Sequence, residues 1–393
     1  MKNISNFDIA VFASALCMTI VVIVLATLAE NQQTDRPTTI AYLSPAAGGL
    51  EQLWISSIDN PDEAEKLTDT EGGIYNFSVS SDGRYIAYAV RNIEAGNLSD
   101  IFLLNLQTRQ VQQLTNCATE QADCKSPTFQ PGGDIIGYER ININSDLENV
   151  GVGAVRIWLL DFSTTPFTTR PLSDNSQYIG HTPLWADSGE AIAFYSADIA
   201  QPGILIYDFG AAEGAALKYI PGNTGTMGTI SPDGNVVIFP ETAQLTGGSE
   251  DGDAFPVFGT HLRIADLDEL ELVNLTDPDT AYDDINARWH PDGTRAAITR
   301  KYSGDDGTFG YQFYLLDIET RTADTLIYSD NHTHGYMEWN STGDKVIYQR
   351  LRLFNDDGSS AIRPAPEILV YDMQTDDNIL FSDNAFHPRQ VFP

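Results

Sequence analysis

Short apolar runs alternate with polar turns along most of the chain, and this pattern returns about every 50 residues. In each repeat an aromatic or branched residue precedes a turn of the Pro/Ser-x-Gly type, and a short apolar run follows, as in VSSDGRYIAYAV and WADSGEAIAFYS. The turn glycines are Gly83, Gly133, Gly189, Gly234, Gly293 and Gly343, at separations of 50, 56, 45, 59 and 50 residues. Repeats of this length that contain only strand signals predict an all-β fold, the β-propeller.

Each repeat contains four short strands, which we name A to D from the central channel outward. Strand A precedes the turn and strand B follows it, and the turn needs glycine because a positive φ there carries no Cβ penalty. Strands B and C are nearly continuous apolar runs, such as YIAYAV and IFLLNL. Such runs are typical of strands that are buried on both faces, as they are between packed blades. Six complete repeats follow this plan.

The two ends of the chain supply a seventh blade. Thr39 to Leu43 reads as a strand B with no strand A before it, whereas the segment from Ala385 onward reads as a strand A with nothing after it. We therefore predict a seven-bladed propeller of four-stranded blades, in which the C-terminal strand completes the first blade. Closing the ring in this way removes free sheet edges. The alternative is that the last residues form a frayed tail.

The segment from Ile9 to Ala29 contains 21 residues without a charge. As a helix it is about 30 Å long, the thickness of the hydrocarbon core of a bilayer. It is longer than the apolar core of about 7–15 residues that is usual in a signal peptide. We predict a flank at 1–8, a retained transmembrane signal anchor at 9–29, a polar linker at 30–38 and the propeller at 39–393. A cleaved signal peptide is the alternative.

Two features favour a location outside the cytoplasm, either periplasmic or at the cell surface. Lys2 lies before the apolar segment, whereas Glu30 and Asp35 follow it, and this favours an inner N-terminus. Cys117 and Cys124 are the two cysteines of the predicted propeller and lie in one loop between blades two and three. Their proximity favours a disulfide, which forms in oxidising compartments. Two thiols or a metal pair are the alternatives.

The formal net charge is −33, from 55 acidic and 22 basic residues. Such a surface repels nucleic acid phosphates and anionic lipid headgroups, which argues against nucleic acid as a partner. The excess of acidic residues would be explained by a basic partner, by divalent cations or by simple solubility in a salty habitat.

Some of the acidic residues lie in long loops. In a propeller the B–C and D–A loops share one face, while the A–B and C–D turns share the other. The long B–C loops are 141–154, 241–260, 303–310 and 355–366. The last three, in blades five to seven, contain the acidic residues Asp251, Asp253, Asp305, Asp306, Asp356 and Asp357. Because elaborated loops on a rigid scaffold usually carry binding, we expect this acidic rim to hold a partner or a cation, on the face away from the tether.

Calcium is the cation to consider at this rim, and no other cofactor is expected. A hard cation needs six to eight oxygen ligands, and none of the three loops has the D-x-D-x-D-G…E ligand order. Short Asp-Gly clusters are more often solvated turns, so calcium stays the lesser alternative.

The repeats resemble those of TolB-like, WD40-like (PD40) propellers. TISPDGNVVIF, RWHPDGTRAAIT and LLDIET carry the resemblance, which extends over about Thr39 to Pro393. It implies the propeller fold but says little about function, because the same blades occur in scaffold proteins, in peptidase propellers and in lyases.

The search for catalytic residues is mostly negative. The sequence contains no G-x-S-x-G elbow, no P-loop and no Rossmann glycine pattern. His332 and His334 form an H-x-H on a D–A loop, similar to the metal-binding histidines of oligogalacturonate lyases, and His181 has the matching place in blade four. These three residues are candidate ligands of a transition metal. The alternative is that they are hydrogen-bonded loop residues.

The five tryptophans are Trp54, Trp158, Trp185, Trp289 and Trp339. Three of them occupy the same strand A position, so blade packing explains them better than carbohydrate stacking does.

The favoured interpretation is a membrane-anchored, extracytoplasmic propeller that binds protein partners in or near the membrane. It would be a non-enzymatic scaffold or accessory subunit of an envelope or membrane complex. The alternative is a metal-dependent polysaccharide lyase, or a glycan-binding protein, that uses the channel mouth on the loop face.

Overall fold

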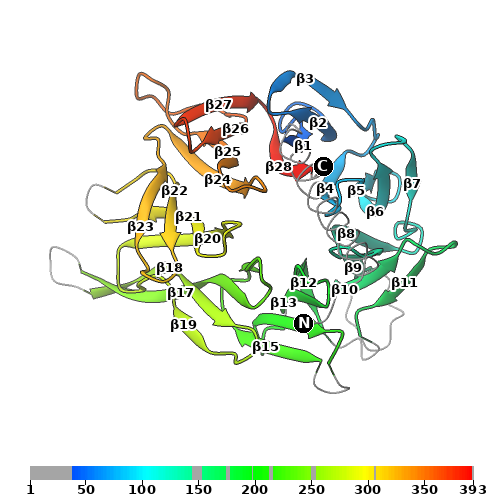
Figure 1. Ribbon diagram of the computed structural model, residues 1–393, viewed down its shortest axis with the longest axis horizontal. Helices are drawn as coiled ribbons and strands as arrows, with labels where there is room; N and C mark the ends of the chain where they lie inside the picture. The colour runs from blue at the N-terminus through cyan, green and yellow to red at the C-terminus, as the bar shows by residue number, and fades with distance from the viewer. Residues whose placement is uncertain are drawn as a thin grey trace, which may run out of the picture.

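The computed structural model describes residues 38–143, 153–173, 178–196, 198–211, 216–248, 254–304 and 307–391, with the backbone alone at 244–248 and 254–257. The described strands form seven antiparallel sheets of four strands each, arranged in a ring around a central axis (Figure 1). The predicted seven-bladed propeller is therefore confirmed.

The blades are numbered in chain order, with the strands given from the inside outward. Blade 1 contains β28 (Phe386–Val391), β1 (Thr39–Ser44), β2 (Gln52–Ser57) and β3 (Asn60–Lys66). Blade 2 contains β4 (Ile74–Val79), β5 (Tyr85–Asn92), β6 (Leu98–Asn105) and β7 (Val111–Gln113), and blade 3 contains β8 (Ala122–Phe129), β9 (Ile135–Asn142), β10 (Val155–Asp161) and β11 (Thr168–Pro171). Blade 4 contains β12 (Gly180–Trp185), β13 (Ala191–Ser196), β14 (Gly203–Asp208) and β15 (Leu217–Pro221). Blade 5 contains β16 (Thr229–Ile230), β17 (Val236–Gly248), β18 (Ala254–Asp266) and β19 (Leu272–Asn274). Blade 6 contains β20 (Tyr282–Trp289), β21 (Arg295–Tyr302), β22 (Gln312–Asp317) and β23 (Ala323–Ile327), and blade 7 contains β24 (His332–Trp339), β25 (Lys345–Arg352), β26 (Glu367–Asp372) and β27 (Asp377–Ser382).

The C-terminal strand closes the ring, as predicted. β28 pairs with β1 in antiparallel register, with Thr39 opposite Val391 and Ala41 opposite Arg389. The alternative of a frayed tail is therefore wrong for the described residues. Pairing the first and last segments of the chain leaves no inner strand missing from any blade.

The core consists of seven hydrophobic clusters, one at each boundary between neighbouring blades. At the boundary of blades 5 and 6, for example, Ile238 and Leu262 pack with Ala296 and Ile298. The B strands contribute the largest buried side chains, among them Tyr88, Tyr138, Phe194, Phe239 and Tyr348. This burial confirms that strands B lie between packed layers.

The turn that follows strand A uses glycine in the left-handed region, as expected for five of the six predicted glycines. Gly83, for example, has a φ of +66°. Blade 3 differs, because the positive φ falls on Gly132 and not on Gly133. Pro131 precedes Gly132, and a Pro-Gly pair places the left-handed residue one position earlier, as in a type II turn.

The three tryptophans at the end of strand A link neighbouring blades. The indole Nε1 of each donates to a backbone carbonyl of the preceding blade's inner strand: Trp185 to Thr128 (3.2 Å), Trp289 to Thr229 (3.3 Å) and Trp339 to Arg288 (3.3 Å). The interpretation of these residues as blade packing is thus confirmed.

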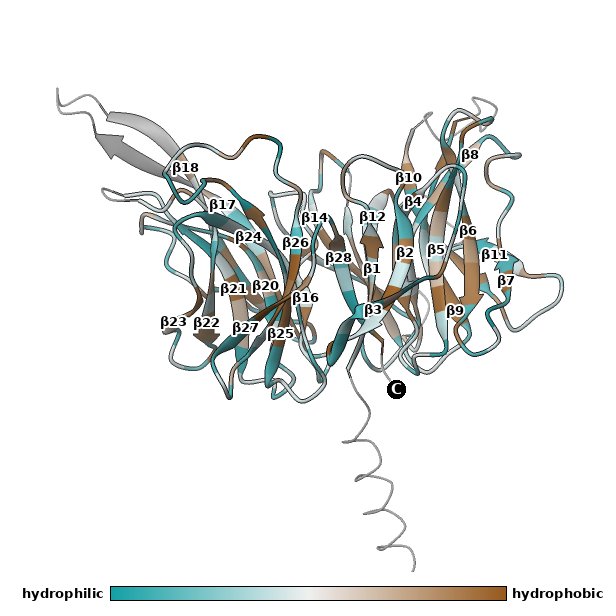
Figure 2. Ribbon diagram, turned by 90° about the horizontal axis from the view of Figure 1, so that it is seen from above, coloured by the Kyte–Doolittle hydropathy of each residue, from teal (hydrophilic) through white to brown (hydrophobic). Residues whose placement is uncertain are grey.

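The ring has two distinct faces, which Figure 2 shows edge-on. The loop face is formed by the B–C and D–A loops, and the turn face by the A–B and C–D turns. The first described strand, β1, begins at the turn face, because each strand B runs from the turn face to the loop face. The predicted anchor at 9–29 and nearly all of the linker lie outside the described residues. Among the residues that are described, no helix is long and apolar enough to cross a bilayer.

Candidate binding surfaces

The longest strands of the molecule form an arm on the loop face. β17 and β18 contain 13 residues each and stay paired as far as Gly248 and Ala254, whereas β5 has eight residues. The five additional residues extend the hairpin by about 17 Å at the usual rise per residue. The segment 241–260, expected to be a loop, is therefore largely a continued hairpin. Phe258 on the arm is 68% exposed.

Exposed apolar side chains also lie on the B–C loops of blades 6 and 7. Phe309 is 76% exposed, and its ring contacts that of Phe354 edge-on, with centroids 4.9 Å apart. Ile362, in the same loop as Phe354, is 89% exposed. Exposure of this degree at several large apolar residues in adjacent loops is typical of an interaction surface.

The acidic rim is described only in blade 7. Asp251, Asp253, Asp305 and Asp306 lie outside the described residues. Asp357 accepts hydrogen bonds from the backbone N–H and the hydroxyl of Ser359, and these bonds hold its pKa below the usual range. Asp356 is exposed and pairs with Arg352 at 3.3 Å. The B–C loop of blade 7 thus presents a hydrogen-bonded acidic turn beside exposed apolar groups.

The candidate metal ligands are not brought together. His332 and His334 lie on β24, whereas His181 lies on β12, in blade 4. The Nδ1 of His334 is 3.1 Å from the carbonyl oxygen of Tyr311, and the ring packs between Phe313 and Tyr348. Burial lowers the pKa of His334 to about 4. In the described ranges, no group of three His, Cys, Asp or Glu side chains has an arrangement suited to a metal ion.

Cys117 and Cys124 form a disulfide, with their Cα atoms 5.9 Å apart. Both residues are buried in the cluster between blades 2 and 3. The bond therefore joins the end of blade 2 to the beginning of β8.

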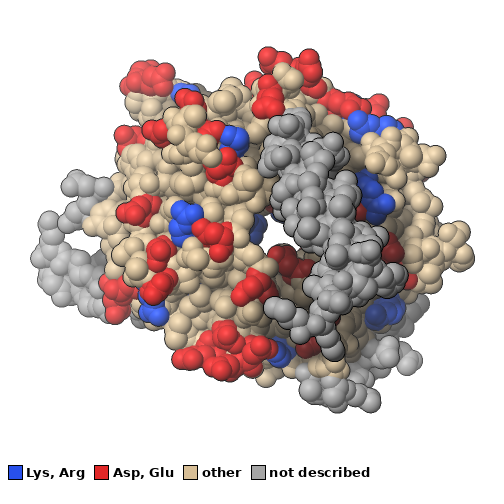
Figure 3. All heavy atoms as spheres, viewed as in Figure 1, with Lys and Arg blue, Asp and Glu red and all other residues tan. Residues whose placement is uncertain are grey.

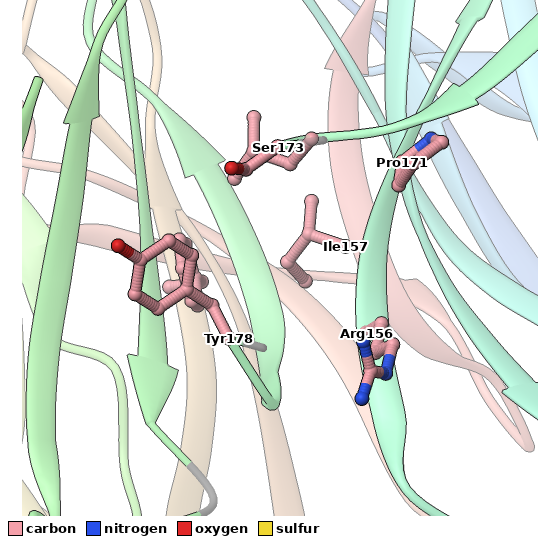
Figure 4. Close-up of a pocket in the computed structure, with 7 residues that line it drawn as sticks. Arg156, Ile157, Pro171, Ser173 and Tyr178 are labelled. Carbon is pink, nitrogen blue, oxygen red and sulfur yellow. The ribbon is translucent and has the colours of Figure 1, made fainter. Parts of the chain in front are cut away.

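A small pocket on the loop face lies between blades 3 and 4 (Figure 4). It is lined by Arg156 and Tyr178 among others and has room for about one water molecule. The Nε and Nη1 atoms of Arg156 are buried and have no hydrogen-bond partner in the described part of the chain. Burial lowers the pKa of this guanidinium.

A much larger cavity occupies the axis of the ring. It has a volume of about 800 Å³ and is lined by residues of all seven inner strands. Asp187, Pro232, Pro291 and Ser341 belong to A–B turns, so the cavity reaches the turn face.

Charged and aromatic side chains of blades 1, 6 and 7 meet on one wall of this cavity. Arg389 of β28 pairs with Glu338 of β24, and the hydroxyl of Tyr336 donates to the same carboxylate. The guanidinium carbons of Arg288 and Arg389 lie 5.4 and 4.9 Å from the centre of the Tyr336 ring. Burial raises the pKa of Tyr336, so the phenol stays protonated. His387 also lines the cavity, and its enclosure by protein lowers its pKa.

The sequence analysis missed this cluster. Arg288 and Glu338 directly precede Trp289 and Trp339, the tryptophans at the end of strand A. Side chains alternate along a strand, so the position before a buried tryptophan faces the channel. A comparison of this single position across the repeats would have found both residues.

The turn face is also acidic, as the many Asp and Glu side chains in Figure 3 show. Each of the six A–B turns contains one aspartate: Asp82, Asp134, Asp187, Asp233, Asp292 and Asp344. Several of these residues accept turn hydrogen bonds, as Asp233 does from Ser231 and Asn235. Acidic residues are therefore found on the turn face as well as in the long B–C loops of the loop face.

Comparison with known proteins supports the resemblance of the repeats. No protein-family model matches the chain. The Tol-Pal system protein TolB of Francisella tularensis subsp. mediasiatica (strain FSC147) is 27% identical over 245 residues, which cover 52% of this chain and 55% of that protein. TolB of F. tularensis subsp. holarctica (strain OSU18) is 26% identical over 238 residues, covering 52% and 53%. The chain thus spans about half the length of the curated relatives it matches.

Solved structures share the fold. A structure from an analysis of two prolyl endopeptidases matches with a TM-score of 0.56 at 11% identity, covering 89% of this chain and 48% of that one. A puromycin-hydrolyzing peptidase of Mycobacterium tuberculosis gives 0.52 at 12% identity, with 78% and 45% covered. At such identities the likeness concerns architecture alone. By its sequence similarity and its architecture, the chain is a seven-bladed β-propeller whose repeats resemble those of the TolB-like, WD40-like (PD40) propellers.

Proposed function

We propose that the chain is a membrane-tethered, extracytoplasmic propeller that binds a protein partner through the loop face of blades 5 to 7. It would serve as a scaffold or accessory subunit of an envelope or membrane complex. The observation that carries this proposal is the exposed apolar group of Phe258, Phe309 and Ile362, which accompanies the acidic turn of blade 7. Scattered single apolar residues need no explanation, but three on the B–C connections of consecutive blades, one on the extended hairpin and two in loops, favour an interface.

The chemistry of this surface indicates the kind of partner. Aromatic and aliphatic side chains supply most of the binding energy in protein interfaces, while complementary charge selects the partner and speeds its association. With a net charge of −33, the chain fits a partner segment that combines apolar and basic residues.

Three further observations support the proposal. The relatives of similar sequence are named as proteins of the Tol-Pal system, which suggests a role among other proteins. The first described strand begins at the turn face, so a tether before Thr39 would leave the loop face directed away from the membrane. The disulfide is consistent with an oxidising compartment. Nothing in the described part of the chain favours the metal-dependent lyase, which we do not propose.

The test is recovery of the full chain from its own membranes in mild detergent, with quantification of proteins that co-purify in fixed stoichiometry. Phe309→Ser combined with Ile362→Ser should remove the partner, because both changes delete exposed apolar contacts without touching the core. Ile379→Ser is the matched control, since Ile379 is 52% exposed but lies on β27, the outer strand of blade 7. The proposed surface would be contradicted if the partner still co-purified with the double variant. Equal loss of the partner in the Ile379→Ser control would also contradict it.

A further inference from the structure

The axial cavity contains an arginine whose charge is not neutralised. The guanidinium of Arg288 makes no ion pair and no hydrogen bond with any residue of the described ranges, although the side chain is half-buried. The guanidinium lies over the face of the Tyr336 ring, 5.4 Å from its centre. A guanidinium has five N–H donors in a planar fork, so this one has donors available to a ligand in the cavity.

The nearest carboxylate of the same wall is already occupied. Glu338 accepts from Arg389 and Tyr336 through one oxygen and from the backbone N–H of Gln390, at 3.1 Å, through the other. This arrangement is shared by β24 and β28 and fixes Tyr336 against Arg389. With two arginines and one glutamate, the wall carries one positive charge in excess. The remaining acidic residue in the lining of the cavity, Asp187, belongs to blade 4, two blades from Arg288 in blade 6.

The surroundings restrict the ligand. Trp289, Trp339 and Phe77 line the same cavity and supply apolar surface. Each A–B turn at the turn face carries an aspartate, and such a ring disfavours an incoming group of high negative charge. A carboxylate has one charge and matches the guanidinium fork with two parallel hydrogen bonds, whereas a phosphate group carries about −1.5 to −2.

We infer that the axial cavity binds a small monocarboxylic acid, whose carboxylate pairs with Arg288 and whose body packs against Trp289 and Trp339. This site lies toward the turn face and is separate from the partner surface proposed on the loop face. Its failure would leave that proposal unaffected.

The experiment is calorimetric titration of the full-length chain in detergent with acetate, with benzoate and with inorganic phosphate. We expect saturable binding of benzoate at one site, weaker binding of acetate because it has less apolar surface, and little binding of phosphate. Arg288→Gln should weaken benzoate binding by at least about tenfold, because a charged hydrogen-bonded pair is replaced by a neutral contact. Arg288→Lys should weaken it less, since the charge remains but the fork is lost.

Arg84→Gln is the matched control. Arg84 is an exposed arginine that pairs with Asp82 in an A–B turn and does not line the cavity. Circular dichroism and the thermal midpoint of each variant establish that it is folded. Absence of saturable benzoate binding, equal binding by Arg288→Gln, or preferential binding of phosphate would each overturn the inference.

Discussion

At the scale of single residues, the propeller uses side chains that look available for a ligand to join its blades. Trp185, Trp289 and Trp339 each donate their indole N–H to the backbone of the preceding blade. Trp158 lies instead on a strand C, where its Nε1 is buried without a hydrogen-bond partner among the described residues and Arg140 lies over the ring at 4.6 Å. The same residue type therefore contributes through a hydrogen bond in one position and through its apolar surface in another.

This difference predicts opposite outcomes for two similar substitutions. Trp289→Phe removes the bond to Thr229 and should lower the free energy of unfolding by about 1 kcal/mol beyond the effect of lost size. Trp158→Phe removes a donor that has no partner and should cost less, because an unbonded buried N–H is itself unfavourable. Urea denaturation of both variants, monitored by circular dichroism, measures the difference. A larger loss in Trp158→Phe would contradict this account.

Histidine burial predicts acid sensitivity. The folded chain holds His334 neutral with its pKa near 4, whereas an unfolded histidine titrates at about 6.5. Between these values the unfolded chain binds more protons, so stability should be complete above about pH 6.5 and should fall as the pH decreases toward 4. The loss from this residue alone is up to about 3 kcal/mol.

The measurement is the free energy of unfolding in urea at a series of pH values between 7.5 and 4.5. His334→Gln should flatten the slope in this window, although it will also lower stability at neutral pH. His181→Gln is the control, since His181 stacks on Tyr195 and is not fully buried. An unchanged slope in His334→Gln would show that other groups control the acid response.

At the scale of elements, local chemistry made the blades predictable. The A–B turns mark six blades, since each has glycine near its end and three of them also have a proline, and the unpaired B strand at Thr39 indicates the seventh. The features that could not be predicted depend on which strands pair or lie side by side, and local sequence does not specify this. The arm at 241–260 contains Gly247, Gly248 and Gly259, which read as loop residues, yet cross-strand hydrogen bonding extends the hairpin through them. The cluster of Arg288, Glu338 and Arg389 unites three inner strands far apart in sequence, and only ring closure brings them together.

The closing strand predicts a severe effect of truncation. Deleting residues 384–393 removes β28, which leaves β1 as an open inner edge and Glu338 without Arg389. We expect loss of the cooperative thermal transition, or association of chains through the exposed edges. Size-exclusion chromatography and thermal denaturation test this, with deletion of residues 392–393 alone as the control. A truncated chain that remains monomeric and melts at the same temperature would contradict the role assigned to β28.

At the scale of the whole molecule, the two faces differ in shape more than in charge. Asp and Glu are found on both, but the loop face carries the extended hairpin of β17 and β18 and the exposed Phe309 and Ile362. The turn face carries short turns and one end of the axial cavity. Aspartates in the short A–B turns are explained by the backbone N–H groups that donate to them, as at Asp233 and Asp292. A partner protein and a small ligand therefore have separate places on the same rigid ring.

The pairing of β28 with β1 also bears on how the chain is made. β1 is among the first parts of the propeller to leave the ribosome, and β28 is synthesised after all the other strands. During elongation the blades can stack one upon another, but the first blade waits for its inner strand until the other six blades have been made. A chain that stops before β28 would keep an unpaired strand edge at β1, through which chains can associate. Ring closure therefore requires all seven blades to be synthesised before the first blade is complete.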